Sequence, residues 1–366
     1  MTTQPDIRRP LLFAAMASFI VLGAYQAVLG PALPVYRQMF ALDTASAGWL
    51  ISTLGIGSFI GIAGMYFVGH RVTSRLALGA MALGAVLLAF APSWIVTLGG
   101  GVIFGMGYGS VATLFNARIM AAFGPRGPAM VSLINALYSV GAIAAPLVFV
   151  ALGSEPKMIF GIIAGIAVLT IITSGQAGRA QAAGVVNTSG FKLHPPILLF
   201  GALAIGMEVC LTGLAPSALI LTGIAPEQAA ELLSMFFVAF LLGRIGLTLL
   251  ATRVHAFTAF TFALGFTALC GLGCALYDPV WFYPPIGLAV GLFFPGFFVT
   301  ATGNMGADAR VAPVVLGTCQ IGAVLSPLAV AALMPQMGDK GFFWLMAGCA
   351  GVMALLAAVF FRQLSR

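Results

Sequence analysis

Long stretches of hydrophobic residues follow one another along this chain, and short polar segments or segments with glycine and proline separate them. A helix that crosses a bilayer needs about 20 mostly apolar residues. The stretches have this length, so each predicts a membrane-spanning helix. The twelve predicted spans are residues 10–34, 46–69, 75–92, 95–122, 128–152, 157–175, 196–222, 229–252, 256–276, 280–305, 312–335 and 341–361.

Four prolines lie inside these spans rather than at their ends. Proline has no backbone N–H, and its ring collides with the carbonyl four residues earlier in a helix. We therefore expect helix breaks at Pro146, Pro216, Pro295 and Pro327.

The composition agrees with a membrane protein and excludes several other classes. Of the 366 residues, 61% are hydrophobic and 7% are charged, whereas soluble domains carry about 25% charged residues. This excludes a soluble enzyme, a secreted disulfide module and a nucleic-acid binder. The five cysteines lie within apolar stretches and are interpreted as small apolar side chains. We expect no cofactor and no metal site.

The positive charges predict the orientation of the chain. Cytoplasmic loops of membrane proteins carry an excess of lysine and arginine. With the N-terminus in the cytoplasm, thirteen of the 16 lysines and arginines fall at or near the inner side, and only Arg37, Lys157 and Lys340 fall outside. We therefore expect a multi-pass protein of the cell (inner) membrane with both termini in the cytoplasm. The net charge of +7 then needs no nucleic-acid partner.

The two halves of the chain resemble each other. The segment Gly141–Leu147 in the fifth span is repeated as Gly322–Leu328 in the eleventh, 181 residues later. The sequence predicts an all-α membrane protein of twelve transmembrane helices in two pseudo-symmetric six-helix bundles. These bundles are residues 1–175 and 196–366, and residues 176–195 form a cytoplasmic linker.

Glu208 is the main candidate for chemistry because it is the only acid deep inside a predicted span. A charged side chain at the bilayer centre costs about 2.5–3.5 kcal/mol on insertion scales. Such a residue is expected to face a cavity and to favour its neutral, protonated form. We interpret Glu208 as a proton-coupling residue. The alternative is a structural carboxyl that is bonded to a neighbouring helix.

Several uncharged polar side chains lie at similar depth and are candidates for binding a polar solute. Their alternative role is hydrogen bonding between helices, worth about 0.6–2 kcal/mol each. The candidate substrate-binding residues are Tyr25, Gln26, Asn116, Asn135, Tyr138, Thr212 and Gln320.

Arg118 and Arg244 lie toward the inner ends of their spans, and we assign them gating or structural roles. Long basic side chains near helix ends commonly place their charge at the membrane surface. The glycine-rich segments, including Gly105 to Gly109, are interpreted as close helix packing. A phosphate-binding loop would need a preceding strand, which is absent from this pattern.

With these features in hand, the chain resembles the Major Facilitator Superfamily, and within it the fucose–galactose–gluconate:proton symporter group (L-fucose permease-like). The segments that carry the resemblance are Pro34–Phe40, Gly107–Asn116, Leu133–Ile143, Gly206–Cys210, Phe240–Arg244 and Gly322–Pro327. Fucose permease has acids at positions that correspond to Gly30 and Ala112, whereas the glutamate of other members in span seven matches Glu208. The resemblance implies sugar–proton symport with the coupling at Glu208.

Three functions are weighed from the sequence. The first is a secondary active transporter that moves a small polar solute, a sugar or similar compound, together with protons. The second is an exporter of hydrophobic or amphipathic compounds, which the 29 phenylalanines favour. The third is a non-transporting receptor or assembly factor. An enzyme is not expected, because no nucleophile–base pair stands out. The expected partners are a small-molecule solute, protons and the lipid bilayer, and we expect a monomer.

Overall fold

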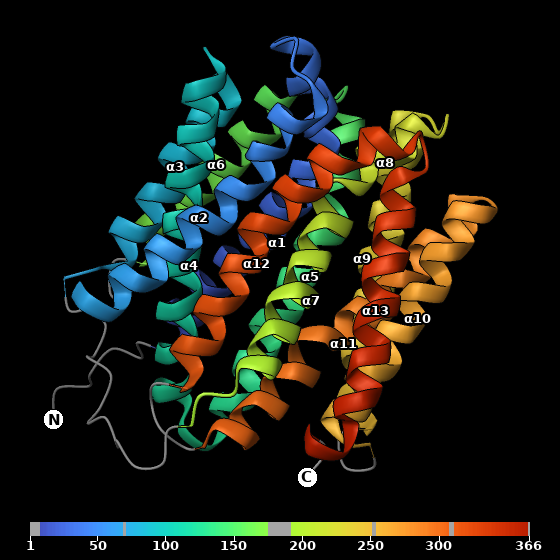
Figure 1. The fold of residues 1–366 in the computed structure, drawn as a ribbon. Helices are drawn as coiled ribbons and strands as arrows, with labels where there is room; N and C mark the ends of the chain where they lie inside the picture. The colour runs from blue at the N-terminus through green and yellow to red at the C-terminus, as the bar shows by residue number, and fades with distance from the viewer. Residues whose placement is uncertain (1–7, 69–70, 175–191, 251–253, 307–310, 365–366) are drawn as a thin grey trace, which may run out of the picture. The chain divides into compact units, whose positions relative to one another are not determined.

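A computed structural model describes residues 8–68, 71–174, 192–250, 254–306 and 311–364, and all regular structure in these ranges is helical (Figure 1). The predicted all-α fold is thereby confirmed. Only the last four residues of the predicted linker, 176–195, fall within the described ranges.

The chain divides into two compact units, each described here by itself. Unit 1 comprises Met1–Phe40 and Thr53–Gly184, and unit 2 comprises Ala41–Ser52 and Val185–Arg366. The short segment Ala41–Ser52 contains the first turns of one helix and groups with unit 2, which the sequence pattern did not indicate.

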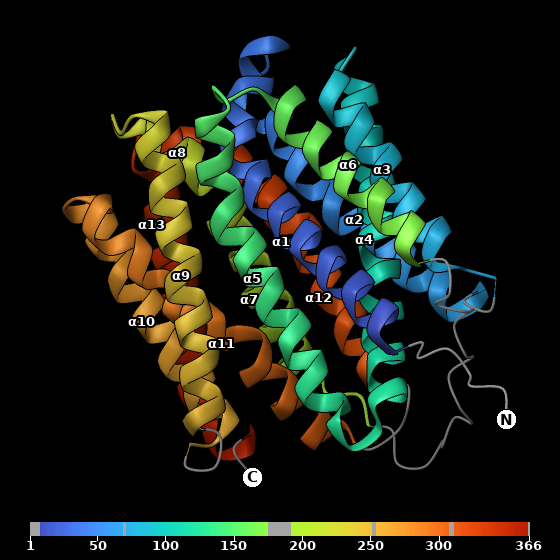
Figure 2. The same ribbon diagram turned by 180° about the vertical axis from the view of Figure 1, so that it is seen from behind.

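Each predicted span coincides with a helix, to within a few residues at its ends (Figures 1 and 2). The helices of the first half are α1 (Arg8–Met39), α2 (Thr44–Val68), α3 (Ser74–Phe90), α4 (Trp94–Phe123), α5 (Gly127–Ala151) and α6 (Pro156–Thr173). Those of the second half are α7 (Pro195–Gly213), α8 (Ala215–Leu221), α9 (Pro226–Leu250), α10 (Ala256–Leu276), α11 (Pro279–Met305), α12 (Val311–Leu333) and α13 (Gly341–Leu364).

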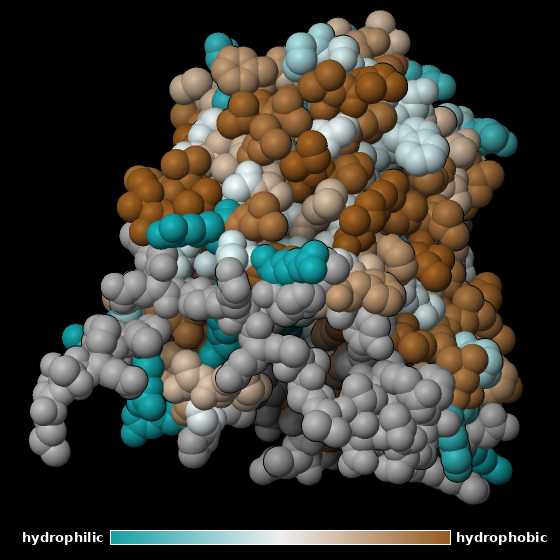
Figure 3. All heavy atoms as spheres, turned by 90° about the vertical axis from the view of Figure 1, so that its left-hand side faces the viewer, coloured by the Kyte–Doolittle hydropathy of each residue, from teal (hydrophilic) through white to brown (hydrophobic). Residues whose placement is uncertain are grey.

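Ten of the described helices are long and apolar enough to cross a membrane, and α3 and α6 are shorter apolar helices. Large hydrophobic side chains on their outer surfaces remain exposed, such as Phe67, Phe90 and Ile95. Hydrophobic atoms cover much of the face in Figure 3. A soluble protein rarely exposes such extended apolar surface, and hydrocarbon is its natural surrounding.

Glycine contacts show that the two units repeat one packing scheme. In α2 and α4 of unit 1, a Cβ on Gly61 would collide with the carbonyl of Met106. In α9 and α11 of unit 2, a Cβ on Gly243 would collide with the carbonyl of Leu288. Both the glycine and the carbonyl recur 182 residues later in the chain.

The same correspondence holds for the helices that begin each half. Gly141 of α5 lies directly against the carbonyl of Ile20 in α1, and Gly322 of α12 lies directly against the carbonyl of Ala202 in α7. Only glycine permits this approach, because any side chain would separate the two backbones. The helix pairs α1 with α5 and α7 with α12 are therefore equivalent.

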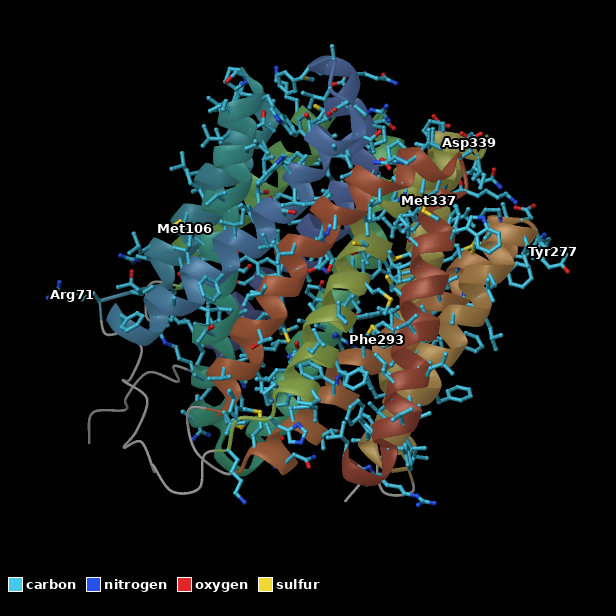
Figure 4. All side chains as sticks on the ribbon, viewed as in Figure 1. Arg71, Met106, Tyr277, Phe293, Met337 and Asp339 are labelled. Carbon is cyan, nitrogen blue, oxygen red and sulfur yellow. The ribbon has the colours of Figure 1, made fainter. Side chains whose placement is uncertain are left out.

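Two lysines occupy matching places in the units. Lys340, just before α13, donates through Nζ to the carbonyl of Tyr277 at the end of α10 (2.6 Å). Lys157, at the start of α6, places its Nζ 5.8 Å from the centre of the Phe90 ring at the end of α3. Figure 4 shows Tyr277 and Asp339 at one end of unit 2. A cation stabilises the negative end of a helix dipole.

The predicted helix breaks at proline are wrong in three of four cases. Helices α5, α11 and α12 continue through Pro146, Pro295 and Pro327. Membrane helices tolerate proline when neighbouring groups satisfy the backbone that it disrupts. In unit 2, the Ser52 hydroxyl donates to the carbonyl of Val324, one turn before Pro327 (2.8 Å).

The break near Pro216 is confirmed, because α7 ends at Gly213 and α8 begins at Ala215. The predicted span 196–222 is therefore two helices. The buried hydroxyl of Tyr283 in α11 donates to the carbonyl of Leu211, in the last turn of α7 (2.7 Å). This bond satisfies a carbonyl beside the break, where a lost partner could not be replaced by water.

Substitution of the crossing glycines by alanine is predicted to lower thermal stability in detergent. Overpacking costs about 1–3 kcal/mol, so Gly141→Ala and Gly322→Ala should each lower Tm. Gly161→Ala and Gly348→Ala are matched controls, because no atom lies within 4 Å of a Cβ at either position. Alanine favours a helix over glycine by about 0.5–1 kcal/mol, so the controls should keep or raise Tm. Equal shifts in both pairs would contradict the crossing contacts.

Tyr283→Phe is predicted to lower Tm in the same measurement, because it leaves the buried Leu211 carbonyl without its donor. The expected loss is about 0.6–2 kcal/mol, the range for hydrogen bonds between membrane helices. Tyr277→Phe is the control, since the Tyr277 side chain is 71% exposed. A Tm of the Tyr283 variant equal to that of the control would show that the bond contributes nothing.

Candidate functional site

The candidate residues fall into one set in each unit. In unit 2, Glu208 lies on α7, five residues before the end of that helix. The residue is half-buried, and its Oε2 atom is shielded from solvent. Within the described ranges, Oε2 has no hydrogen-bond partner. A membrane-embedded carboxyl in this state is a default candidate for function.

Arg244 of α9 supplies the charge that acts on Glu208. Its guanidinium carbon lies 4.3 Å from the centre of the Phe240 ring, one turn earlier on the same helix. The Phe240 side chain is buried. Arginine over an aromatic face is a favourable cation–π arrangement. The guanidinium is thus turned toward a buried ring, which the predicted surface-directed position did not include.

Helix α12 contributes Cys319, whose thiol is buried and lies within electrostatic reach of Glu208. Gln320 follows it and is half-buried. Thr212 is buried, and its hydroxyl donates to the carbonyls of Glu208 (3.0 Å) and Val209 (3.3 Å) in its own helix. The Thr212 proton is therefore committed to the helix, which leaves only the oxygen lone pairs for other contacts.

In unit 1, the structure joins Gln26 of α1 to Tyr108 of α4. The Tyr108 hydroxyl donates to Oε1 of Gln26 across 3.1 Å. Gln26 is half-buried, in contrast to its neighbour Tyr25, which is fully buried. The Tyr25 ring stacks on Phe104 with ring centres 3.5 Å apart. Tyr25 thus lies in an aromatic core, although its hydroxyl has no hydrogen-bond partner within the described ranges.

The other predicted residues of unit 1 lie on α4 and α5. Asn135 donates through Nδ2 to the carbonyl of Val131 in its own helix (2.9 Å), which leaves its Oδ1 as an acceptor. Asn116 has a buried Oδ1 without a partner in the described ranges. Tyr138 and Arg118 are half-buried. The printed contacts do not bring these four side chains together.

Sequence reasoning did not select Tyr108, Phe240 or Cys319 as site residues. Tyr108 stands between two glycines, Gly107 and Gly109, in a segment that was interpreted as packing alone. Cys319 was interpreted as an apolar side chain. Only the spacing of the repeats contains a signal for these residues, because Cys319 occupies in α12 the place of Tyr138 in α5.

Comparisons with known proteins identify the family. A model of the Major Facilitator Superfamily matches residues 11–319. No curated protein sequence matches the chain at a significant level.

Solved structures with the same fold are transporters of low sequence identity. The chain is similar to the nucleoside transporter NupG, with 15% identity, a TM-score of 0.76, and coverage of 97% of this chain and 99% of that one. It is similar to a D-xylose–proton symporter, with 14% identity, a TM-score of 0.75 and 98% coverage of both chains. A POT family transporter in complex with 5-aminolevulinic acid has 11% identity, a TM-score of 0.80, and coverage of 98% and 97%.

At these identities the solved structures establish the fold and leave the solute open. The family model spans most of the chain, and the paired helices of the two units follow one repeated scheme. This chain therefore belongs to the Major Facilitator Superfamily and is a multi-pass membrane transporter, not an enzyme.

Proposed function

We propose that this transporter moves a small polar solute, a sugar or sugar-like compound, together with protons by alternating access. The observation that carries the proposal is the carboxyl of Glu208, whose shielded Oε2 has no hydrogen-bond partner in the described ranges. A carboxyl without fixed donors gains little from staying ionised. It can therefore take up a proton on one side of the membrane and release it on the other.

Further support comes from the surroundings of Glu208. Arg244 acts on it with a positive charge, so both protonation states remain accessible to a buried acid. The Glu208 carboxyl forms no ion pair among the described residues, and a locked pair would have argued against proton exchange. The likeness to a D-xylose–proton symporter supports a sugar-like solute. Membership of the fucose–galactose–gluconate group remains part of this proposal.

The polar residues on both units are proposed to contact the solute. Half-buried Gln26, Asn116, Asn135, Tyr138 and Gln320 are the best placed by their exposure, whereas Tyr25 and Thr212 are buried. Amides and hydroxyls suit a solute that is rich in hydroxyl or carbonyl groups. We retain Arg118 and Arg244 as gating or structural residues, a monomeric state, and a cell-membrane location with both termini in the cytoplasm.

The exporter hypothesis depends on phenylalanines that would line a binding site. In unit 2, Phe236, Phe237 and Phe240 are fully buried and pack on one another. Their surface is already covered by protein, so it is not available to an amphipathic compound. This favours a polar solute over an amphipathic one.

Glu208→Gln is predicted to abolish uphill uptake and to leave exchange intact. Glutamine keeps the shape of the side chain but does not titrate, so solute can cross without a proton. Proteoliposomes with an acidic exterior would be given labelled D-xylose, uridine or 5-aminolevulinic acid, with a pH dye inside. Accumulation should fall to the outside concentration, and proton entry should stop.

Glu231→Gln is the control, because Glu231 is an exposed acid at the start of α9. It should accumulate solute like the unmodified protein. Uphill uptake that persists in the Glu208 variant would refute the coupling role. A complete absence of solute flux would instead favour the receptor or assembly-factor hypothesis.

A further inference from the structure

The repeat of the two units identifies the position in unit 1 that corresponds to Glu208. Ile20 of α1 and Ala202 of α7 are the equivalent residues at the helix crossings. Gln26 lies six residues after the first, and Glu208 lies six residues after the second. One half therefore carries an acid where the other half carries its amide analogue.

The partner of this position also differs between the halves. Gly105 and Gly109 of α4 correspond to Gly287 and Gly291 of α11, and each of the four touches the matching carbonyl of α2 or α9. Between these glycines, Tyr108 corresponds to Val290. The half with the amide has a hydroxyl that bonds to it, and the half with the acid has a buried valine.

Tyr108 is held rigidly by the glycines on either side of it. Gly109 lies against the carbonyl of Ser58 in α2, and Gly107 lies against Ala77 and Met81 in α3. Helix α4 is thereby held on two faces, and Tyr108 reaches α1 from a third. Groups that are fixed by packing hold a binding side chain more accurately than groups on a mobile segment.

The hydrogen bond decides which end of the Gln26 amide is available. Its Oε1 accepts from Tyr108, so the Nε2 end points elsewhere. An amide nitrogen carries two N–H donors and cannot accept. Gln26 has no other hydrogen bond among the described residues, so both donors are left for a bound molecule.

We infer that Tyr108 is a positioning residue that orients Gln26, and that Gln26 donates its two N–H groups to an acceptor oxygen of the solute. This inference rests on the proposed transport function. It assigns to the solute a carbonyl, carboxylate or hydroxyl oxygen that binds at unit 1, while the proton is carried in unit 2. The two repeats thus divide the work, with a fixed donor in one and a titrating acid in the other.

Uptake kinetics in proteoliposomes test this assignment with D-xylose, uridine and 5-aminolevulinic acid as probes. Tyr108→Phe removes the hydroxyl and lets the amide turn over, so KM should rise about fivefold while the maximal rate stays within about twofold. Gln26→Ala should raise KM by about tenfold. Tyr277→Phe, at an exposed position, is the control and should keep the KM of the unmodified protein.

Gln26→Glu gives a readout that a structural role would not produce. A carboxylate only accepts hydrogen bonds, so at high pH the variant should bind poorly, and protonation at low pH should restore a donor. The ratio of its KM to that of the unmodified protein should therefore fall as the pH is lowered. This variant keeps the side-chain shape, so it remains informative even where Tyr108→Phe does not fold.

The outcomes separate the inference from the proposed function. Uptake with an unchanged KM in Tyr108→Phe and Gln26→Ala, or a KM ratio for Gln26→Glu that does not vary with pH, overturns the role of Gln26 and Tyr108 alone. No uptake of any of the three probes by the unmodified protein counts against both proposals. A raised KM together with the pH-dependent ratio supports the assignment.

Discussion

Close contact between a glycine and a backbone carbonyl of the next helix is the interaction on which both units depend. Within a membrane the hydrophobic effect does not press helices together, so association relies on close packing. The crossings of Gly141 with Ile20 and of Gly322 with Ala202 place whole helices in direct backbone contact. Because these contacts recur with a fixed spacing along the chain, they also set the depth of every side chain relative to its counterpart.

From this shared scaffold the two units have diverged at one position. In unit 1, Gln26 and Tyr108 form a neutral, hydrogen-bonded pair. In unit 2, Glu208 meets the positive charge of Arg244, while Val290 stands where the tyrosine would be. A bonded amide keeps one orientation, whereas a carboxyl without fixed donors can change its protonation state. The same backbone thus supports two different chemical tasks.

The cation in unit 2 has no counterpart in unit 1 either. Arg244 follows Gly243, and the residue after the equivalent Gly61 is Ile62. An arginine inside a membrane protein needs favourable contacts, and the buried Phe240 ring provides one. The acid and the cation therefore occur together in the same half, which is consistent with mutual electrostatic stabilisation of groups that are costly in hydrocarbon.

The sequence alone determined the helical class, the limits of the spans and the duplication, because each apolar stretch must cover the thickness of a bilayer. It also singled out Glu208, since one acid in an apolar stretch is visible without a structure. It failed for Pro146, Pro295 and Pro327, whose helices continue. Only the tertiary structure decided that the start of α2 groups with unit 2, that Tyr108 bonds to Gln26 and that Arg244 turns toward Phe240. These features join residues far apart in the chain, and local hydrophobic patterns contain no information about which distant groups meet.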